Sequence, residues 1–314
     1  MKKIPSLLLK SLVSLALLAL LFYQAEWDEL RRLVVTVDWR FLAGGLLCVA
    51  AGVAVSCYKW KVILRVDGMD CPLSTLVRYY LIGTFFNNFL PTSIGGDAVR
   101  AYYLSRSYGR TSVAVSSILA ERLSGLVVLL LFPVLAFFPS SISAHGGISW
   151  FWGALPVFLI FAGCLFLVPA TRNVWSSLLP PGLPNKMDGI LESLGQYLSD
   201  ARSLFAMIFC SAFFNLLVVL VSFFVAKSLG LDIRFIDLMV VVPLVVLLTL
   251  VPFSLNGLGI REGGFIYFLS NFGVSGTEAL SFSLLSYLLV IVVSIIGGLM
   301  FISHFEGKFQ IGSS

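Results

Sequence analysis

Residues 91–100 read Pro-Thr-Ser-Ile-Gly-Gly-Asp-Ala-Val-Arg and form a polar, turn-rich break inside a very apolar chain. Residues 252–261, Pro-Phe-Ser-Leu-Asn-Gly-Leu-Gly-Ile-Arg, repeat the pattern Pro-x-Ser-(Ile/Leu)-x-Gly-x-x-(Val/Ile)-Arg at an offset of 161 residues. A repeat at half the chain length indicates an internal duplication, and interrupted segments in corresponding halves of a membrane protein indicate a binding site. We therefore expect two repeats, residues 1–138 and 150–305, within a single transmembrane domain of residues 1–314.

The composition predicts an all-α polytopic membrane protein. Of 314 residues, 59% are hydrophobic and 12% are charged, whereas a soluble domain carries about 25% charged residues. The apolar runs suit membrane helices rather than barrel strands. The net charge of +5 is attributed to orientation and lipid contact, and no nucleic-acid partner is expected. The five cysteines include no Cys-x-x-Cys pair and the two histidines are far apart, so we expect no disulfide framework and no metal site.

Hydropathy and charge divide the chain into six full spans and two shorter apolar segments. The expected spans are residues 11–23, 41–58, 111–138, 150–169, 204–226 and 279–303. Residues 26–40 and 186–202 carry apolar residues at helical spacing among charges, which predicts two amphipathic helices that lie at the membrane interface or, alternatively, serve as linkers against the bundle. The basic residues that follow the second span, Lys59, Lys61 and Arg65, are interpreted as a positive loop.

The apolar segment of residues 79–90 is too short to cross the membrane as a straight helix of about 20 residues. Basic residues lie before it and after the following break, so the positive-inside rule places both of its ends on the cytoplasmic side. We therefore expect a re-entrant broken-helix hairpin there, and a second hairpin that runs from residues 237–252 to residues 263–272. Irregular backbone at that depth is tolerated only where it is buried in protein or faces water.

Counting spans from a cytoplasmic N-terminus makes each element of the second half the counterpart of a first-half element turned over, with both termini in the cytoplasm. This is the inverted-topology repeat of many transporters. The two breaks, residues 91–100 and 252–261, are then expected to face each other near the middle of the membrane. Gly297 and Gly298 in the last span are expected to let another helix pack closely.

Arg100 and Arg261 occupy equivalent positions in the two breaks and are the leading candidates for binding a lipid phosphate. Arginine suits this task because its planar guanidinium donates two parallel hydrogen bonds. Backbone N–H groups at Gly95, Gly96 and Gly257 could assist if each opens a half-helix. The alternative for Arg100 is an ordinary anchor on the cytoplasmic side.

Acidic residues beside these arginines are candidates for pairing with them. Asp97 either forms a local ion pair that fixes the loop, or receives a cationic headgroup or a proton. Glu262 adjoins Arg261, and neighbouring residues on a helix do not face each other, so its partner is expected elsewhere. Glu121 and Arg122 lie inside the third span, where an unpaired charge costs at least about 3 kcal/mol. They either line a cavity coupled to the hairpins or lie near the interface and snorkel.

The remaining residues at the breaks are interpreted mainly as structural. Amide side chains can satisfy freed backbone groups or contact the substrate, and these are Asn87, Asn88 and Asn256. Proline removes a backbone donor and ends helices, and glycine permits tight turns. The residues of these two types at the breaks are Pro91, Gly95, Gly96, Pro252, Gly257 and Gly259.

Taken together, these motifs resemble the lysylphosphatidylglycerol synthase/flippase transmembrane family over nearly the whole chain. The segments that carry the resemblance are Asn-Asn-Phe-Leu-Pro at 87–91, Gly-Gly-Asp-Ala-Val-Arg at 95–100, Glu-Arg-Leu-Ser-Gly at 121–125 and Asn-Gly-Leu-Gly-Ile-Arg-Glu-Gly-Gly at 256–264. Only a short tail follows the last span, so we expect a stand-alone member without the soluble aminoacyl-transfer domain of bifunctional members. The resemblance implies lipid translocation or lipid binding in the cytoplasmic membrane of a bacterium or archaeon.

Three functions are weighed against these features. The leading one is a flippase that moves an anionic phospholipid, an aminoacyl-phospholipid or a polyprenyl-phosphate lipid between leaflets. A membrane-embedded lipid transferase is disfavoured, because the sequence has no paired-carboxylate metal motif and no nucleophile–base cluster. We therefore expect no enzymatic activity and no cofactor. A non-transporting lipid-binding accessory of an envelope-biogenesis system is left open, as is a homo-oligomer.

Overall fold

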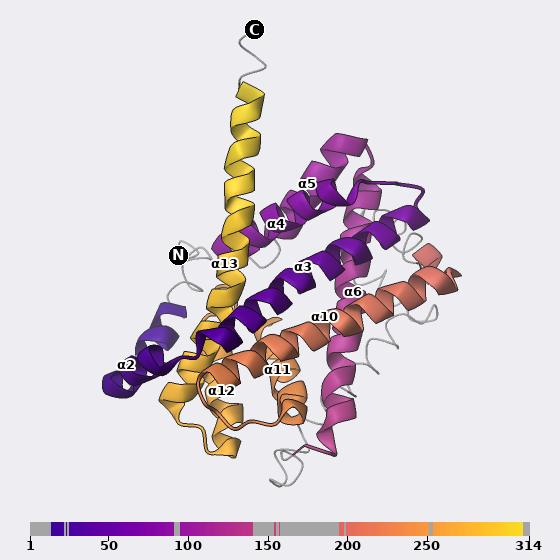
Figure 1. Cartoon of the computed structure of the whole chain (residues 1–314). Helices are drawn as coiled ribbons and strands as arrows, with labels where there is room; N and C mark the ends of the chain where they lie inside the picture. The colour runs from indigo at the N-terminus through magenta and orange to yellow at the C-terminus, as the bar shows by residue number, and fades with distance from the viewer. Residues whose placement is uncertain are drawn as a thin grey trace, which may run out of the picture.

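The computed structural model describes residues 14–21, 23, 25–90, 95–140, 154, 157, 195–197, 199–250 and 254–309. All regular structure in these ranges is helical, which confirms the predicted all-α class (Figure 1). Within them, four helical segments are long and apolar enough to cross a membrane. They are α3 (Trp39–Val66), α6 (Thr111–Phe137), α10 (Ala201–Ser228) and the part Gly276–Ser303 of α13 (Gly276–Phe309). The protein is a polytopic membrane protein.

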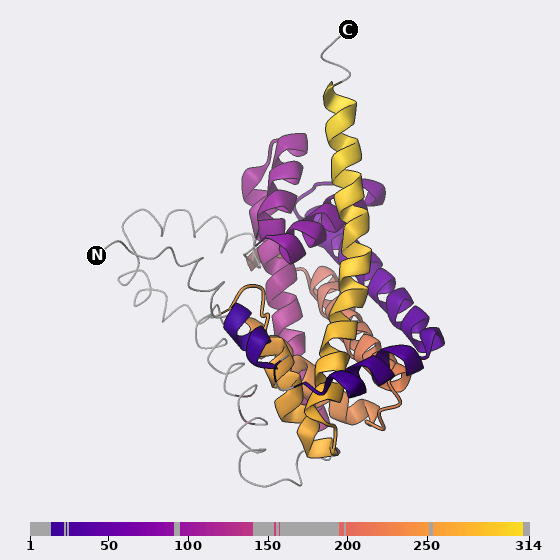
Figure 2. The same ribbon diagram turned by 90° about the vertical axis from the view of Figure 1, so that its left-hand side faces the viewer.

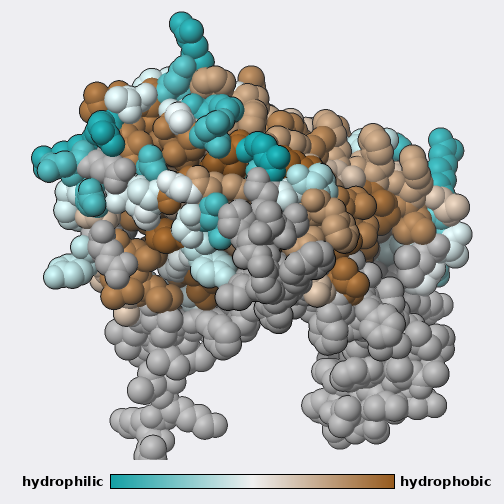
Figure 3. All heavy atoms as spheres, turned by 90° about the horizontal axis from the view of Figure 1, so that it is seen from below, coloured by the Kyte–Doolittle hydropathy of each residue, from teal (hydrophilic) through white to brown (hydrophobic). Residues whose placement is uncertain are grey.

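These helices confirm four of the expected spans, those at residues 41–58, 111–138, 204–226 and 279–303. The first expected span is described only in part, where residues 14–21 are helical. The fourth, residues 150–169, lies outside the described residues apart from 154 and 157. Apolar side chains cover much of the described surface in Figure 3, as expected for a chain that contacts lipid.

The second span is longer than predicted. α3 continues through Lys59, Lys61 and Arg65, so the prediction of a positive loop there is wrong. The reason is packing, because Trp60, Ile63 and Leu64 on the same stretch are fully buried and keep it helical.

The predicted amphipathic helix within residues 26–40 is confirmed as α2 (Trp27–Thr36). Leu33 is buried on its inner face, while Asp28 and Arg31 are exposed on the other. A hydrogen bond from the Glu26 N–H to the Thr277 hydroxyl, 3.1 Å long, ties the start of α2 to α13. Its expected counterpart at residues 186–202 lies largely outside the described residues.

The first break separates α4 (Leu73–Phe89) from α5 (Gly95–Tyr108), which pack against each other as a hairpin. The two helices touch at glycines, since a Cβ added to Gly96 would lie 1.8 Å from the carbonyl oxygen of Gly83. The Gly96 N–H donates to Asn87 Oδ1 at 2.8 Å, so Asn87 satisfies a backbone group at the start of α5. Pro91 lies outside the described residues.

The second break separates α11 (Phe235–Leu250) from α12 (Ile260–Leu269). A short 3-10 helix, η2 (Ser270–Phe272), follows α12. Asn256, Gly257 and Gly259 all have positive φ, of 49°, 75° and 84°. Glycine adopts this conformation without steric cost, which explains its place in the turn. Pro252 lies outside the described residues.

The hairpins and spans recur at the offset of the sequence motif. Shifting α3, α4 and α6 by 161 residues brings them to 200–227, 234–250 and 272–298, which overlap α10, α11 and α13. The packing recurs as well, because α4 lies against α13 just as α11 lies against α6. The described helices thus recur at the offset of the repeated motif, and the duplication itself stays a prediction.

The repeat-related helices α3 and α10 lie side by side and run antiparallel (Figures 1 and 2). At one end the Asp38 N–H donates to the Ser228 carbonyl at 3.1 Å. Further along the pair, the Lys59 ammonium donates to the Ser211 hydroxyl at 3.1 Å. Gly52 lies against the Phe214 ring between them. In the predicted inverted repeat, the twofold axis that relates α3 to α10 would pass near Gly52 and Phe214, perpendicular to the two helices.

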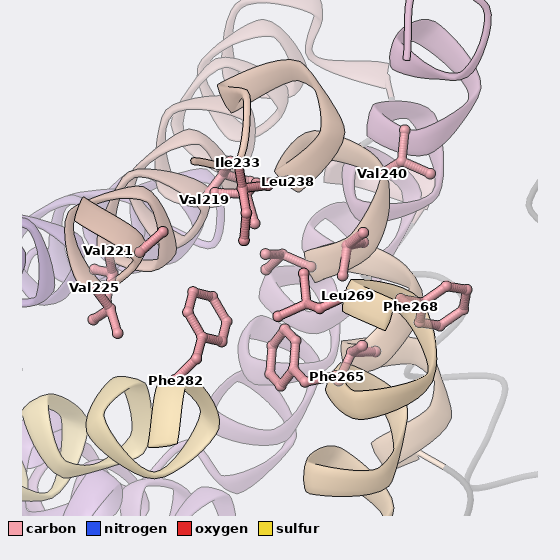
Figure 4. Packing of buried hydrophobic residues seen from close by; sticks show 14 of the residues in the cluster. Val219, Val221, Val225, Ile233, Leu238, Val240, Phe265, Phe268, Leu269 and Phe282 are labelled. Carbon is pink, nitrogen blue, oxygen red and sulfur yellow. The ribbon is translucent and has the colours of Figure 1, made fainter. Parts of the chain in front are cut away.

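The largest buried apolar cluster fills the space between α10, α11, α12 and α13 (Figure 4). Phe265 of α12 and Phe282 of α13 meet edge to face, with ring centroids 5.0 Å apart. The glycine contact predicted for the last span is also present, because a Cβ on Gly297 would lie 2.0 Å from the Leu81 carbonyl oxygen of α4. The first contact holds α12, which follows the second break, against α13, and the second holds α13 against α4 of the first hairpin.

Candidate functional site

A cavity of about 290 Å³ lies between α3, α4, α10, α11, α12 and α13, and we call it the central cavity. Most of its lining is apolar, with Val49, Phe214, Leu217 and Val245 among the walls. Of the described residues that line it, Arg261 is the one with a formal charge. An arginine in an apolar cavity within a membrane protein marks a candidate functional site, because the charge is costly there.

Arg261 stands in the first turn of α12, directly after the second break. Its guanidinium lies over the Tyr287 ring, 3.9 Å from the centroid. Nε and Nη2 donate to Glu262 Oε1 at 3.1 and 2.5 Å, and Nε also reaches Ser283 Oγ at 3.4 Å. None of its hydrogen bonds to described residues uses Nη1. The side chain is 15% exposed, so the guanidinium is fixed in direction yet still accessible from the cavity.

The prediction that Glu262 finds its partner elsewhere is wrong, because Glu262 binds Arg261 directly. Glu262 is fully buried, and its Oε2 accepts the Gly259 N–H at 2.6 Å while Oε1 accepts the guanidinium. The physical reason is the helix start. At the first turn the carboxylate turns back to satisfy free N–H groups, and the long arginine side chain can follow it. Glu262 therefore serves as a cap and a counter-ion at once.

Two further polar groups lie on α13 or contact it near Arg261. Asn256 Nδ2 donates to the Tyr287 hydroxyl at 3.3 Å, which links the turn of the second break to α13. Ser286 Oγ is buried and has no hydrogen-bond partner among the described residues. A buried hydroxyl without a partner is costly, so it offers a bond to a ligand in the cavity.

Arg100 is placed differently from Arg261. It is 3% exposed and lies between two aromatic rings, 4.3 Å from the Trp60 centroid and 4.4 Å from the Tyr80 centroid. Nη2 donates to Glu121 Oε2 at 2.5 Å, and Nη1 reaches Asp97 Oδ1 at 3.5 Å. In this conformation Arg100 is enclosed by protein and carries two carboxylate partners.

Four other charged residues of the first half gather around Arg100, and we call residues 59, 97, 100, 121 and 122 the ionic cluster, of which all but Arg122 are buried. Asp97 also accepts from Arg122 at 2.8 Å, although the Arg122 side chain is 54% exposed. Glu121 and Arg122 thus tie α6 to the first hairpin. Asn88 has a buried Nδ2 without a partner among the described residues.

Sequence reasoning missed Lys59, which belongs to this cluster. Its ammonium is buried and donates to the Glu121 carbonyl at 3.0 Å and to Ser211 Oγ at 3.1 Å. A lysine among other basic residues suggests a solvated loop, and the one sequence feature that could have indicated burial is the large apolar Trp60 beside it. Tyr80 and Tyr287 were missed as well, because no charge or motif marks them.

Tyr80 separates the two arginines. Its ring packs over the Arg100 guanidinium and also lines the central cavity that Arg261 lines. The predicted site residues therefore form two groups. One contains Asp97, Arg100, Glu121 and Arg122, and the other contains Asn256, Arg261 and Glu262.

Comparison with known proteins agrees with this architecture. The profile of the lysylphosphatidylglycerol synthase TM region matches residues 7–298. A UPF0104 membrane protein of Pyrococcus horikoshii is 23% identical over 129 residues, which are 40% of this chain and 38% of that protein. A UPF0104 membrane protein of Methanocaldococcus jannaschii is 33% identical over 76 residues, which are 24% of this chain and 23% of that protein. The matched part thus spans less than half of either relative.

Proposed function

The chain belongs to the family of the lysylphosphatidylglycerol synthase transmembrane region, and from this membership we propose that it moves a lipid with an anionic phosphate headgroup between the two leaflets. The observation that carries the proposal is Arg261, the charged residue among the described lining of the central cavity. A guanidinium held in an apolar cavity binds phosphate oxygens through charge-assisted hydrogen bonds.

The surroundings of Arg261 favour an anionic ligand over a cationic one. Both carboxylate oxygens of Glu262 are engaged, by the Gly259 N–H and by the guanidinium. The ligand would meet Nη1 of Arg261 and the Ser286 hydroxyl, which has no partner among the described residues. Both groups donate hydrogen bonds, as a phosphate requires.

The duplication supports a mechanism of alternating access. The antiparallel packing of α3 and α10 is what an inverted repeat across the membrane requires. In the proposal the headgroup binds Arg261 in one state and reaches the Arg100 side in the other, while the hydrocarbon chains stay in the bilayer. This passage requires Tyr80 to move away from Arg100. It also requires Arg100 to separate from its two carboxylate partners, Asp97 and Glu121. N- and C-termini in the cytoplasm are part of the same proposal.

Leaflet exchange in liposomes tests this function. The purified protein is reconstituted with fluorescent phosphatidylglycerol, and a membrane-impermeant quencher reports the fraction in the outer leaflet over time. Exchange well above that of protein-free liposomes supports translocation. If the protein binds the lipid but leaves its exchange at the protein-free rate, the proposal is wrong and the accessory function takes its place.

A further inference from the structure

Two apolar pockets lie on the outer side of α13, next to the central cavity. The α2–α13 pocket has a volume of about 330 Å³, and Leu33, Leu229 and Leu284 are among its walls. The α3–α13 pocket has a volume of about 310 Å³, and Trp39, Leu42 and Leu46 are among its walls. Leu285 and Leu288 of α13 line both pockets, so these two side chains form the ridge between them.

Tyr287 joins these pockets to the candidate site. It lines the central cavity, where Arg261 lies over its ring, and it also lines the α2–α13 pocket. The central cavity shares Tyr287 with the α2–α13 pocket, which in turn shares Leu285 and Leu288 with the α3–α13 pocket. Tyr287 is thus the wall between Arg261 and the first of the two apolar pockets, and a movement of this one side chain would join them.

The depth of the pockets fits the chains of a lipid just below its headgroup. α2, which walls one pocket through Leu33, is amphipathic and exposes Asp28 and Arg31, as a helix at the membrane interface does. The α3–α13 pocket lies at the start of α3, where the exposed Trp39 side chain has the amphipathic character favoured at that interface. Both pockets thus begin at interfacial depth.

We propose that this is a lateral binding site for a phospholipid with two hydrocarbon chains. Its phosphate binds Arg261, one chain lies in the α2–α13 pocket, the other lies in the α3–α13 pocket, and Tyr287 separates headgroup from chains. The inference rests on the proposed function for the identity of the headgroup. Hydrocarbon gains no hydrophobic energy on moving from the bilayer into an apolar pocket, so the pockets select chains by shape and packing.

Photolabelling of the full-length protein tests the site. The protein is reconstituted with a trace of phosphatidylglycerol that carries a diazirine on one chain, irradiated and digested, and labelled peptides are mapped by mass spectrometry. We expect labels to concentrate on residues 281–292 of α13 and residues 33–46, and unlabelled phosphatidylglycerol to compete them away. Even labelling of all lipid-facing helices, including the exposed Leu299 of α13, would overturn the inference.

A matched pair of variants sharpens the result. Leu288 and Leu299 are both exposed leucines of α13, but Leu299 lines neither pocket. Leu288→Trp places a larger side chain between the two pockets, where it occupies part of both. It is expected to reduce pocket labelling about fivefold, which corresponds to about 1 kcal/mol. Leu299→Trp is expected to leave it unchanged. Equal labelling in both variants contradicts the site, and if Leu288→Trp does not fold, the wild-type labelling map decides alone.

Leaflet exchange measured on the same liposomes separates this inference from the proposed function. Concentrated labelling without exchange leaves the binding site intact and refutes translocation. Exchange with evenly distributed labels supports translocation and refutes the site. A one-chain lyso-phosphatidylglycerol probe is expected to compete less well than the two-chain lipid, and equal competition would argue against two chain pockets.

Discussion

The guanidinium of Arg100 lies 4.4 Å from the centre of the Tyr80 ring, and the same ring lines the cavity that contains Arg261. One aromatic side chain thus separates the two arginines that the repeated motif relates. Arg100 is closed off on this side by Tyr80 and on the other by Trp60, while Arg261 faces the cavity. The two halves are alike in helix order and differ in which arginine is accessible.

Removing the carboxylate partner of Arg100 should destabilise the protein strongly. Glu121→Gln leaves a buried guanidinium with one distant carboxylate, and breaking a buried ion pair costs about 3–5 kcal/mol. The free energy of unfolding in detergent measures the loss. Asp70→Asn is the control, because Asp70 is 77% exposed in its pairs with Lys61 and Arg65, and such pairs contribute about 0–1 kcal/mol. Equal losses would show that the cluster does not hold the fold.

The first hairpin should not tolerate a methyl group at Gly96. Its Cβ would lie 1.8 Å from the Gly83 carbonyl oxygen, so Gly96→Ala must push α5 away from α4. We expect a loss of about 1–3 kcal/mol in the free energy of unfolding. Gly263→Ala is the matched control, since no atom lies within 4 Å of the added methyl and alanine favours a helix by about 1 kcal/mol. A neutral Gly96→Ala variant would contradict the close approach of the two helices.

The proposed inverted repeat predicts which helix ends share a side of the membrane. Asp38 and Asp232 lie at one end of the α3–α10 pair, and Asp70 and Ser199 lie at the other. Each of these four exposed positions is replaced by a single cysteine. A membrane-impermeant thiol reagent should label the first two positions from one side of the membrane and the other two from the opposite side. A permeant reagent, which should label all four, is the control. Labelling of all four positions from one side would rule out α3 and α10 as antiparallel spans.

Headgroup charge should control the rate of exchange. A lysyl ester adds ammonium groups near Arg261, and among the described lining residues no other charged group is present to receive them. We expect fluorescent lysylphosphatidylglycerol to exchange at least about tenfold more slowly than phosphatidylglycerol, a difference of about 1.4 kcal/mol. The same assay with both lipids measures it. Equal rates would mean that Arg261 is not the only charged group that contacts the headgroup.

The helix breaks could be predicted from the sequence because their chemistry is local. Gly257 and Gly259 adopt positive φ, and the repeated arginine marks the helix start that follows each break. The pairing of Arg261 with Glu262 could not be predicted, because a rule for helix interiors does not hold in a first turn, where the carboxylate also caps Gly259. Local sequence patterns therefore predicted the turns at the breaks, but not which side chains pair with each other there.

Residues far apart in the chain explain the rest of what sequence reasoning missed. Lys59 is buried only because Ser211 and the Glu121 carbonyl, from two other helices, receive its ammonium. Tyr80 and Tyr287 become part of the site only when α4 and α13 meet at the central cavity. The spacing of residues within one segment cannot reveal such contacts between helices that are far apart in the chain.

The most direct test of the central claim compares two arginines in the leaflet-exchange assay. Arg261 contacts Tyr287, and Arg106 likewise contacts Tyr102. Arg106, however, is exposed on α5 and does not line the central cavity. Loss of a hydrogen bond to a charged group costs about 1.5–3 kcal/mol, so Arg261→Gln should slow phosphatidylglycerol exchange about ten- to hundredfold. Arg106→Gln should leave the rate unchanged. Wild-type exchange in a folded Arg261→Gln variant would contradict the account.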